Sequence, residues 1–137
     1  MTFDELMTVY KKTATTRKKT TNEEHRIQCA CVRWFSMQYP QFHGRLFAVP
    51  NGGKRDTTTA AKLKAEGVIA GVADLILLKR NRDYGALLIE MKKSNGKQSN
   101  NQKCWQKMIS SEGEYKYVVC HSIDEFINEI NNYLANI

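Results

Sequence analysis

Two short apolar runs flanking a polar connector are the clearest feature of the hydrophobic pattern along the chain. Residues 74–78 and 86–90 each join four consecutive apolar side chains to one carboxylate, and residues 79–85 between them are polar and rich in turn formers. Runs of this length around such a connector predict a β-hairpin. Neither run alternates with polar residues, so we expect both strands to be buried on both faces.

The hairpin would bring charged side chains together at one end. If it folds symmetrically about Arg82, Asp74 lies opposite Glu90, and directly opposed Cβ atoms are about 4.5–5.5 Å apart. Lys92 shares the face of Glu90, because side chains two apart on a strand point the same way. Buried carboxylates need a compensating charge, and paired carboxylates with a backbone carbonyl suit Mg²⁺. A salt bridge at the sheet edge, without any chemistry, is the alternative interpretation.

Further elements are predicted on both sides of this hairpin. Helical spacing predicts a helix from Asn22, as its N-cap, to about Gln38, with the acidic pair at residues 23 and 24 in its first turn. A short strand is expected at residues 45–49, and a helix at residues 59–66 that Gly67 terminates. After the hairpin we expect a helix at residues 98–111, a strand at residues 115–120 and a last helix that a capping box opens at Ser122 and Glu125.

The predicted order of elements is typical of an α/β fold with a mixed central sheet flanked by helices. Residues 22–137 form the folded domain, with Ile27, Ala30, Cys31 and Trp34 facing the core from the first long helix and Trp105, Met108 and Ile109 from the second. Residues 1–21 are expected to be a short helix, near residues 3–12, followed by a basic arm. The arm either touches phosphate or is a solvated linker.

Composition bears on the partner and the compartment. The chain has 137 residues and a formal net charge of +7, which favours a polyanionic partner such as nucleic acid, although many basic proteins bind none. The four cysteines form no C-x-x-C pair and have no histidine at zinc-ligand spacing, so we expect reduced, mostly buried thiols. No apolar block predicts a signal peptide or a membrane span. We therefore expect a cytoplasmic protein, in the host cell cytoplasm if it is phage-encoded.

Several linked motifs resemble those of the PD-(D/E)xK nucleases and, more narrowly, of stand-alone VRR-NUC domains of the phage and bacterial type. The resemblance covers roughly residues 22–134 and rests on Glu24-His25-x-x-Gln28, Pro50-Asn51-Gly52-Gly53, Leu63-Lys64-x-Glu66-Gly67-Val68, Gly71-Val72-x-Asp74, Ile89-Glu90-x-Lys92 and Gln102-x-x-Trp105. Ala73 stands where the family often has proline, at a position that shapes the backbone and performs no chemistry. The resemblance implies a restriction-endonuclease-like core and a DNA endonuclease that depends on Mg²⁺ or Mn²⁺.

The resemblance also implies roles for individual residues. Asp74, Glu90 and the carbonyl of Met91 would be metal ligands, and Lys92 would act on the attacking water, either as a base or as an electrostatic helper. Glu24 would contact a second metal or its waters, and the helical register favours it over its neighbour Glu23 because it lies on the inward stripe. Gln102 would fix Lys92 or a water, unless it is an ordinary amide at the rim of the interior.

DNA contacts and assembly follow from the same resemblance. The turn at Asn51, Gly52 and Gly53 would let a phosphate approach, with Lys54, Arg55 and Lys93 as candidate backbone contacts. The family implies a homodimer that acts on branched or four-way junction DNA, and the apolar face of residues 3–10 is candidate interface material. The competing hypothesis is a non-catalytic nucleic-acid-binding module that retains the nuclease fold.

Overall fold

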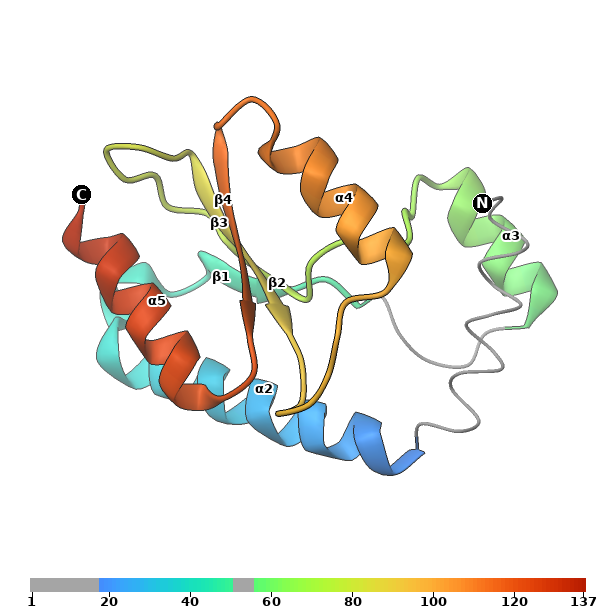
Figure 1. The fold of residues 1–137 in the computed structure, drawn as a ribbon, viewed down its shortest axis with the longest axis horizontal. Helices are drawn as coiled ribbons and strands as arrows, with labels where there is room; N and C mark the ends of the chain where they lie inside the picture. The colour runs from blue at the N-terminus through green and yellow to red at the C-terminus, as the bar shows by residue number, and fades with distance from the viewer. Residues whose placement is uncertain (1–17, 51–55) are drawn as a thin grey trace.

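The computed structural model describes residues 18–50 and 56–137 of the chain. The predicted helix near residues 3–12 and most of the predicted basic arm lie outside the described residues, whereas residues 18–21 belong to the first described helix. The elements are α2 (Lys18–Gln38), η1 (Pro40–Phe42), β1 (Leu46–Ala48), α3 (Thr57–Ala65), β2 (Leu75–Leu77), β3 (Ala86–Met91), α4 (Asn100–Ser110), β4 (Tyr115–Cys120) and α5 (Ile123–Ala135) (Figure 1).

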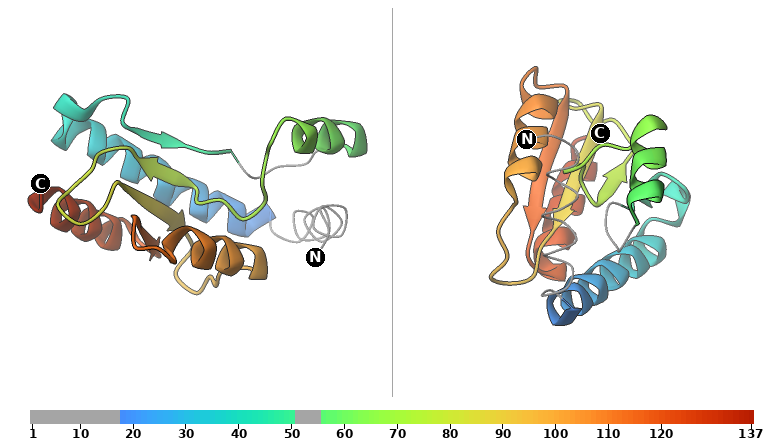
Figure 2. Two further views of the ribbon diagram at one scale, coloured as in Figure 1. Left: turned by 90° about the horizontal axis from the view of Figure 1, so that it is seen from above. Right: turned by 90° about the vertical axis from the view of Figure 1, so that its right-hand side faces the viewer.

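The four strands form one sheet in the order β1-β2-β3-β4. The pairs β1/β2 and β2/β3 are antiparallel, while β3 and β4 are parallel and are joined by the crossover through α4. Helices α2 and α5 cover one face of the sheet and α4 lies against the other (Figure 2). The predicted fold class, a mixed central sheet flanked by helices, is therefore confirmed.

The predicted hairpin register is also confirmed. Leu75 pairs with Ile89 and Leu77 pairs with Leu87, which is the pairing that symmetry about Arg82 requires. Strand β2 is shorter than predicted. It ends at Leu77, and the side chain of Leu78, which was expected to be buried in the strand, is 54% exposed. All six residues of β3 are buried, as the lack of polar alternation predicted.

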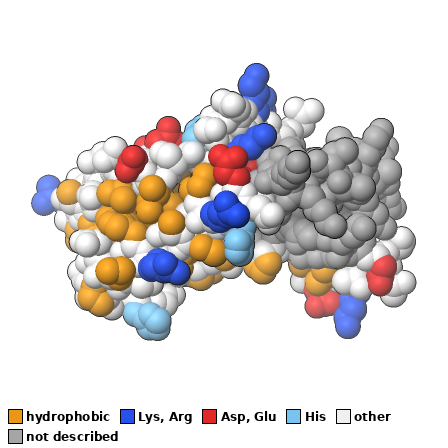
Figure 3. Space-filling view, turned by 90° about the horizontal axis from the view of Figure 1, so that it is seen from below, with side chains coloured by type: hydrophobic (Ala, Val, Ile, Leu, Met, Phe, Trp, Pro, Cys, Tyr) orange, Lys and Arg blue, Asp and Glu red, His pale blue; other side chains and the backbone are white. Residues whose placement is uncertain are grey.

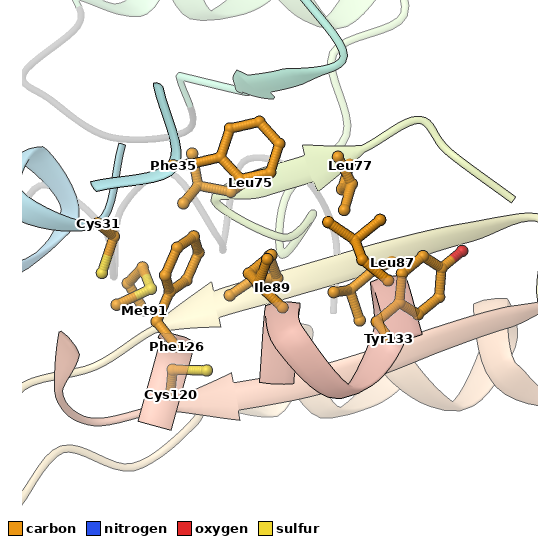
Figure 4. Close-up of a cluster of buried hydrophobic side chains, with 12 residues drawn as sticks. Cys31, Phe35, Leu75, Leu77, Leu87, Ile89, Met91, Cys120, Phe126 and Tyr133 are labelled. Atoms are coloured by element: carbon orange, nitrogen blue, oxygen red, sulfur yellow. The ribbon is translucent and has the colours of Figure 1, made fainter. Parts of the chain in front are cut away.

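The main hydrophobic core lies between the sheet and the helix pair α2 and α5 (Figure 4). Alternate side chains of β2 and β3, together with Cys120 of β4, point into the core from the sheet, and the two helices cover it. The buried residues of this core are Cys31, Phe35, Leu75, Leu77, Leu87, Ile89, Met91, Cys120, Phe126, Ile130, Tyr133 and Leu134. Because strand side chains alternate between faces, the residues between these positions point toward α4. Glu90 and Lys92 lie on that second face.

Three helix boundaries differ from the predictions. Helix α2 begins at Lys18, so Asn22 is not its N-cap and the acidic pair lies beyond its first turn. No proline or glycine interrupts residues 18–22, which lets the helix extend toward the N-terminus. Asp56 caps α3 through a 2.6 Å bond from the Thr59 amide to its Oδ1, and Ser99 caps α4. Gly67 ends the α3 segment with a φ of +100°, as predicted.

The inner face of α4 and the environment of two cysteines also differ from the predictions. Met108 is 67% exposed, whereas Trp105 of the same helix contacts the Tyr117 ring of β4. All four cysteines are free, as expected, but Cys29 and Cys104 are exposed rather than buried. Ser122 caps α5, yet the Glu125 carboxylate accepts from the His121 amide instead of closing a capping box.

The outer face of α2 and α5 carries a mixture of side chains (Figure 3). Basic, acidic and hydrophobic groups are interspersed over the described residues seen in that view. Within residues 18–50 and 56–137, no helix is both long and apolar enough to cross a membrane.

A glycine sets the distance between the segment before β2 and the start of α4. Gly71 has a φ of +84°, and a Cβ atom there would lie 2.6 Å from the Asn101 carbonyl oxygen and 2.7 Å from its carbonyl carbon. Gly67 also has a positive φ, of +100°, but a Cβ atom at Gly67 would meet nothing within 4 Å. Both positions therefore require a positive φ, but only Gly71 lies close to the start of α4.

We expect Gly71→Ala to destabilise the protein more than Gly67→Ala. The control loses about 1–2 kcal/mol for the left-handed conformation alone, and Gly71→Ala adds roughly 1–3 kcal/mol because backbone atoms must move apart. Urea unfolding of both variants measures the difference. Equal free energies of unfolding would contradict the close approach of Gly71 to α4.

Candidate active site

Asp74 lies immediately before β2, where the antiparallel ladder with β3 ends. Its carbonyl accepts a 2.9 Å hydrogen bond from the Val49 amide, and its Oδ2 accepts a 2.8 Å bond from the Met91 amide. The Asp74 carboxylate thus accepts the Met91 amide hydrogen that a backbone carbonyl would accept if the antiparallel ladder continued. This bond holds the carboxylate against the end of β3, next to Glu90.

Glu90 is buried on the face of β3 that points toward α4. Its side chain is only 1% exposed. Oε1 accepts a 2.6 Å hydrogen bond from Gln102 Nε2 and lies 3.8 Å from Lys92 Nζ, and Oε2 is 3.4 Å from the Tyr117 hydroxyl. Lys92 is itself buried, with 4% of its surface exposed. The structure therefore brings together the two acids, the lysine and the glutamine that the sequence singled out.

The electrostatics of this cluster favour an added positive charge. Burial, followed by the negative charge of Asp74 and a hydrogen bond with its carboxyl group, raises the pKa of Glu90 to about 9, against the opposing effect of Lys92. The 2.8 Å bond from the Met91 amide holds the Asp74 carboxylate beside the residue that follows Glu90, which brings the two acids near each other. An added cation would favour the ionised form of both acids in this buried setting, so the charge arrangement is compatible with a bound cation.

Gln102 links the site to the first turn of α4. Its Oε1 accepts a 2.8 Å bond from the Ser99 amide while its own amide donates to Ser99 Oγ at 3.2 Å, which is a complete capping box. The Nε2 end of the same side chain holds Glu90. We expected Gln102 to contact Lys92 or a water, and the structure places it instead against the carboxylate.

Tyr117 belongs to the site although sequence reasoning did not select it. It lies on β4 beside Leu88 in the parallel pairing, which turns its hydroxyl toward Glu90. Burial, together with the nearby Glu90 charge, raises the pKa of Tyr117 above its ordinary value, so the hydroxyl keeps its proton. The period-2 pattern of β4 indicates which residues share its face, but only the register with β3 selects Tyr117.

The donor set fits a hard divalent cation. Carboxylate oxygens are the ligands that Mg²⁺ and Mn²⁺ prefer, and Mg²⁺ commonly takes one or two carboxylates and completes its shell with water and substrate phosphate. Within residues 18–50 and 56–137, no three His, Cys, Asp or Glu side chains gather into a group that could hold a metal. Asp74 and Glu90 would be the two side-chain ligands at the centre of such a site, and the Met91 carbonyl stays a predicted third donor.

The remaining predicted site residues lie apart from this centre or outside the described residues. Glu24 is half-buried on α2 while Glu23 is exposed, which agrees with the predicted register, but the described contacts of Glu90 do not include Glu24. Lys93 is half-buried next to Lys92. The predicted phosphate-contacting turn, residues 51–55, falls outside the described residues.

Comparison with known proteins agrees with the fold and with the place of the site. The family model of the VRR-NUC domain matches residues 18–124, a range that contains every described site residue. A solved structure named "VRR_NUC domain protein" superposes with a TM-score of 0.70 at 32% sequence identity, over 83% of this chain and 89% of that one. No curated protein matches the chain. The chain therefore belongs to the VRR-NUC domain family, which is a family of nuclease-type domains.

Proposed function

We propose that this domain is a metal-dependent DNA endonuclease of the PD-(D/E)xK type. The observation that carries the proposal is the placement of two acids at the buried end of the hairpin, where the Met91 amide holds Asp74 Oδ2 beside the strand position next to the buried Glu90. Lys92 and Gln102 converge on the same glutamate oxygen. A cluster with two acids, one ammonium and one amide is costly to bury without a ligand.

The chain's own residues have separate tasks in this proposal. Asp74 and Glu90 hold Mg²⁺ or Mn²⁺, with the Met91 carbonyl and Glu24 as proposed further donors. The bound cation supplies an activated water and stabilises charge on the phosphate. Lys92 balances the negative phosphate or takes a proton from the attacking water, and its burial suits either task. Gln102 keeps the Glu90 carboxylate in place, and Lys93 contacts the DNA backbone.

Branched DNA and a two-fold homodimer complete the proposal. Each chain carries one such site, and one site cuts one strand. Two sites related by a two-fold axis could cut opposing strands of a four-way junction, and two-fold dimers are the commonest symmetric assemblies. The net charge of +7 favours a polyanionic substrate such as branched DNA.

We expect Asp74→Asn and Glu90→Gln to abolish DNA cleavage and to leave DNA binding unchanged or tighter. Each change removes a metal ligand and also removes a negative charge that repels phosphate. Asp83→Asn is the matched control, because Asp83 is exposed in the connector at the other end of the hairpin. Cleavage and gel-shift assays with Mg²⁺, Mn²⁺ and EDTA measure both properties. Cutting by either site variant would refute the assignment, and binding by the wild type without any metal-dependent cutting would favour the non-catalytic module.

We expect Mn²⁺ to raise the thermal midpoint of the wild-type protein and not that of Asp74→Asn. Ligand at about 100 times its Kd adds about 2.7 kcal/mol, which corresponds to roughly 5–10 °C for a domain of this size. In EDTA at neutral pH, Glu90→Gln should unfold at a higher temperature than the wild type, because burial raises the pKa of Glu90 to about 9 and folding must then protonate a carboxyl group that is ionised in the unfolded chain, whereas glutamine is neutral in both states. Differential scanning fluorimetry tests both statements, and a wild-type midpoint that ignores Mn²⁺ would count against a metal site.

We expect the protein to be a dimer at micromolar concentration and to cut a four-way junction faster than a linear duplex of the same sequence. Sedimentation equilibrium distinguishes a dimer from a monomer of 15.7 kDa. Monomeric mass together with equal cleavage rates on the two substrates would remove both the dimer and the junction from the proposal, while leaving the metal site untouched.

A further inference from the structure

The hydroxyl of Tyr117 connects Glu90 to a pair of glutamines that the proposed chemistry does not use. The hydroxyl is 3.4 Å from Glu90 Oε2 and 3.2 Å from Gln98 Nε2. The same Gln98 nitrogen donates to Gln106 Oε1 at 2.9 Å. This row of hydrogen-bonded side chains begins at Gln106 on α4 and passes through Gln98, which precedes the N-cap of the helix. It continues to Tyr117 on β4 and ends at Glu90 in the site.

The direction of these hydrogen bonds follows from the groups involved. The amide nitrogen of Gln98 can only donate, so the Tyr117 oxygen accepts from it. When Glu90 is ionised, as a metal ligand must be, its carboxylate can only accept, so the proton of the Tyr117 hydroxyl is then the one that faces Oε2. Gln98 therefore turns the hydroxyl so that its proton is directed at the carboxylate.

The two oxygens of Glu90 are held unequally. Gln102 makes a short 2.6 Å bond to Oε1, whereas the Tyr117 hydroxyl stands 3.4 Å from Oε2. A carboxylate held at one oxygen alone can still rotate about its last side-chain bond, and a second donor on the other oxygen fixes the plane. Partners that orient a ligating group in this way commonly change metal affinity 10–100-fold when they are lost.

We propose that Tyr117 is a positioning residue, whose hydroxyl, oriented by Gln98, sets the plane of the Glu90 carboxylate for a divalent cation. This inference rests on the proposed function of Glu90 as a metal ligand. Tyr117 itself does not touch the substrate or the cation. Its effect passes through the Glu90 side chain, and it therefore acts on metal affinity before it acts on the chemical step.

The surroundings of Tyr117 allow the hydroxyl to be removed without disturbing the packing. Its ring contacts the Trp105 ring, with centroids 6.1 Å apart and planes at 58°, and a phenylalanine keeps that contact. Tyr115 lies two residues earlier on the same strand with 36% of its surface exposed. Tyr115→Phe is therefore a matched control that removes the same atom away from Glu90.

The experiment measures binding of Mn²⁺ alone, by electron paramagnetic resonance of the free ion, to the full-length wild type, Tyr117→Phe, Gln98→Ala, the double variant and Tyr115→Phe. We expect Tyr117→Phe to raise the Kd 10–100-fold, Gln98→Ala to raise it less, and Tyr115→Phe to leave it unchanged. The double variant should be no worse than Tyr117→Phe, because Gln98 acts through the hydroxyl. Excess Mn²⁺ should restore cleavage by Tyr117→Phe.

The outcomes separate this inference from the proposed function. Wild-type and Tyr117→Phe proteins with equal affinity for Mn²⁺ would overturn the positioning role and leave the nuclease proposal standing. Wild-type protein that binds no Mn²⁺ would overturn both. Fully additive effects of the two single changes would remove Gln98 from the role. If Tyr117→Phe does not fold, Gln98→Ala carries the test, and an unchanged Kd there would overturn the inference.

Discussion

The placement of two carboxyl groups at the buried end of one hairpin is the constraint around which the site is organised. The register that pairs Leu75 with Ile89 brings Asp74 alongside the end of β3, and the bond from the Met91 amide holds it there. A slip of one residue would turn Glu90 toward the hydrophobic core and lose the pair. The continuous apolar character of both strands buries Glu90 and Lys92 together with them, and burial on both faces penalises such a slip.

Helix α4 supplies the groups that make this burial tolerable. Gln102 donates a hydrogen bond to one Glu90 oxygen and also forms the capping box of α4 with Ser99. Gly71 permits the backbone before β2 to approach the start of the same helix. The described residues leave no buried side-chain nitrogen or oxygen without a partner.

Local chemistry explains why much of the fold and the central residues could be predicted from the sequence. The hairpin, its register and the set Asp74, Glu90, Lys92 and Gln102 follow from short-range patterns and linked motifs. Other features depend on contacts between distant segments. Tyr117 joins the site only through the parallel pairing of β3 with β4, and the exposure of Met108 depends on how α4 packs against the sheet. Neither the register of a parallel pair nor the tilt of a helix is encoded in one stretch of sequence.

The parallel pairing of β3 and β4 has a consequence for the time at which the site forms during folding. A hairpin closes within microseconds because its strands are neighbours in sequence, whereas pairing β3 with β4 requires closure across residues 92–114. The pairing that brings Asp74 and Glu90 together can therefore form before β4 brings Tyr117 to them. A chain truncated before β4 carries both acids without Tyr117, so the complete cluster of side chains arises only with the completed domain.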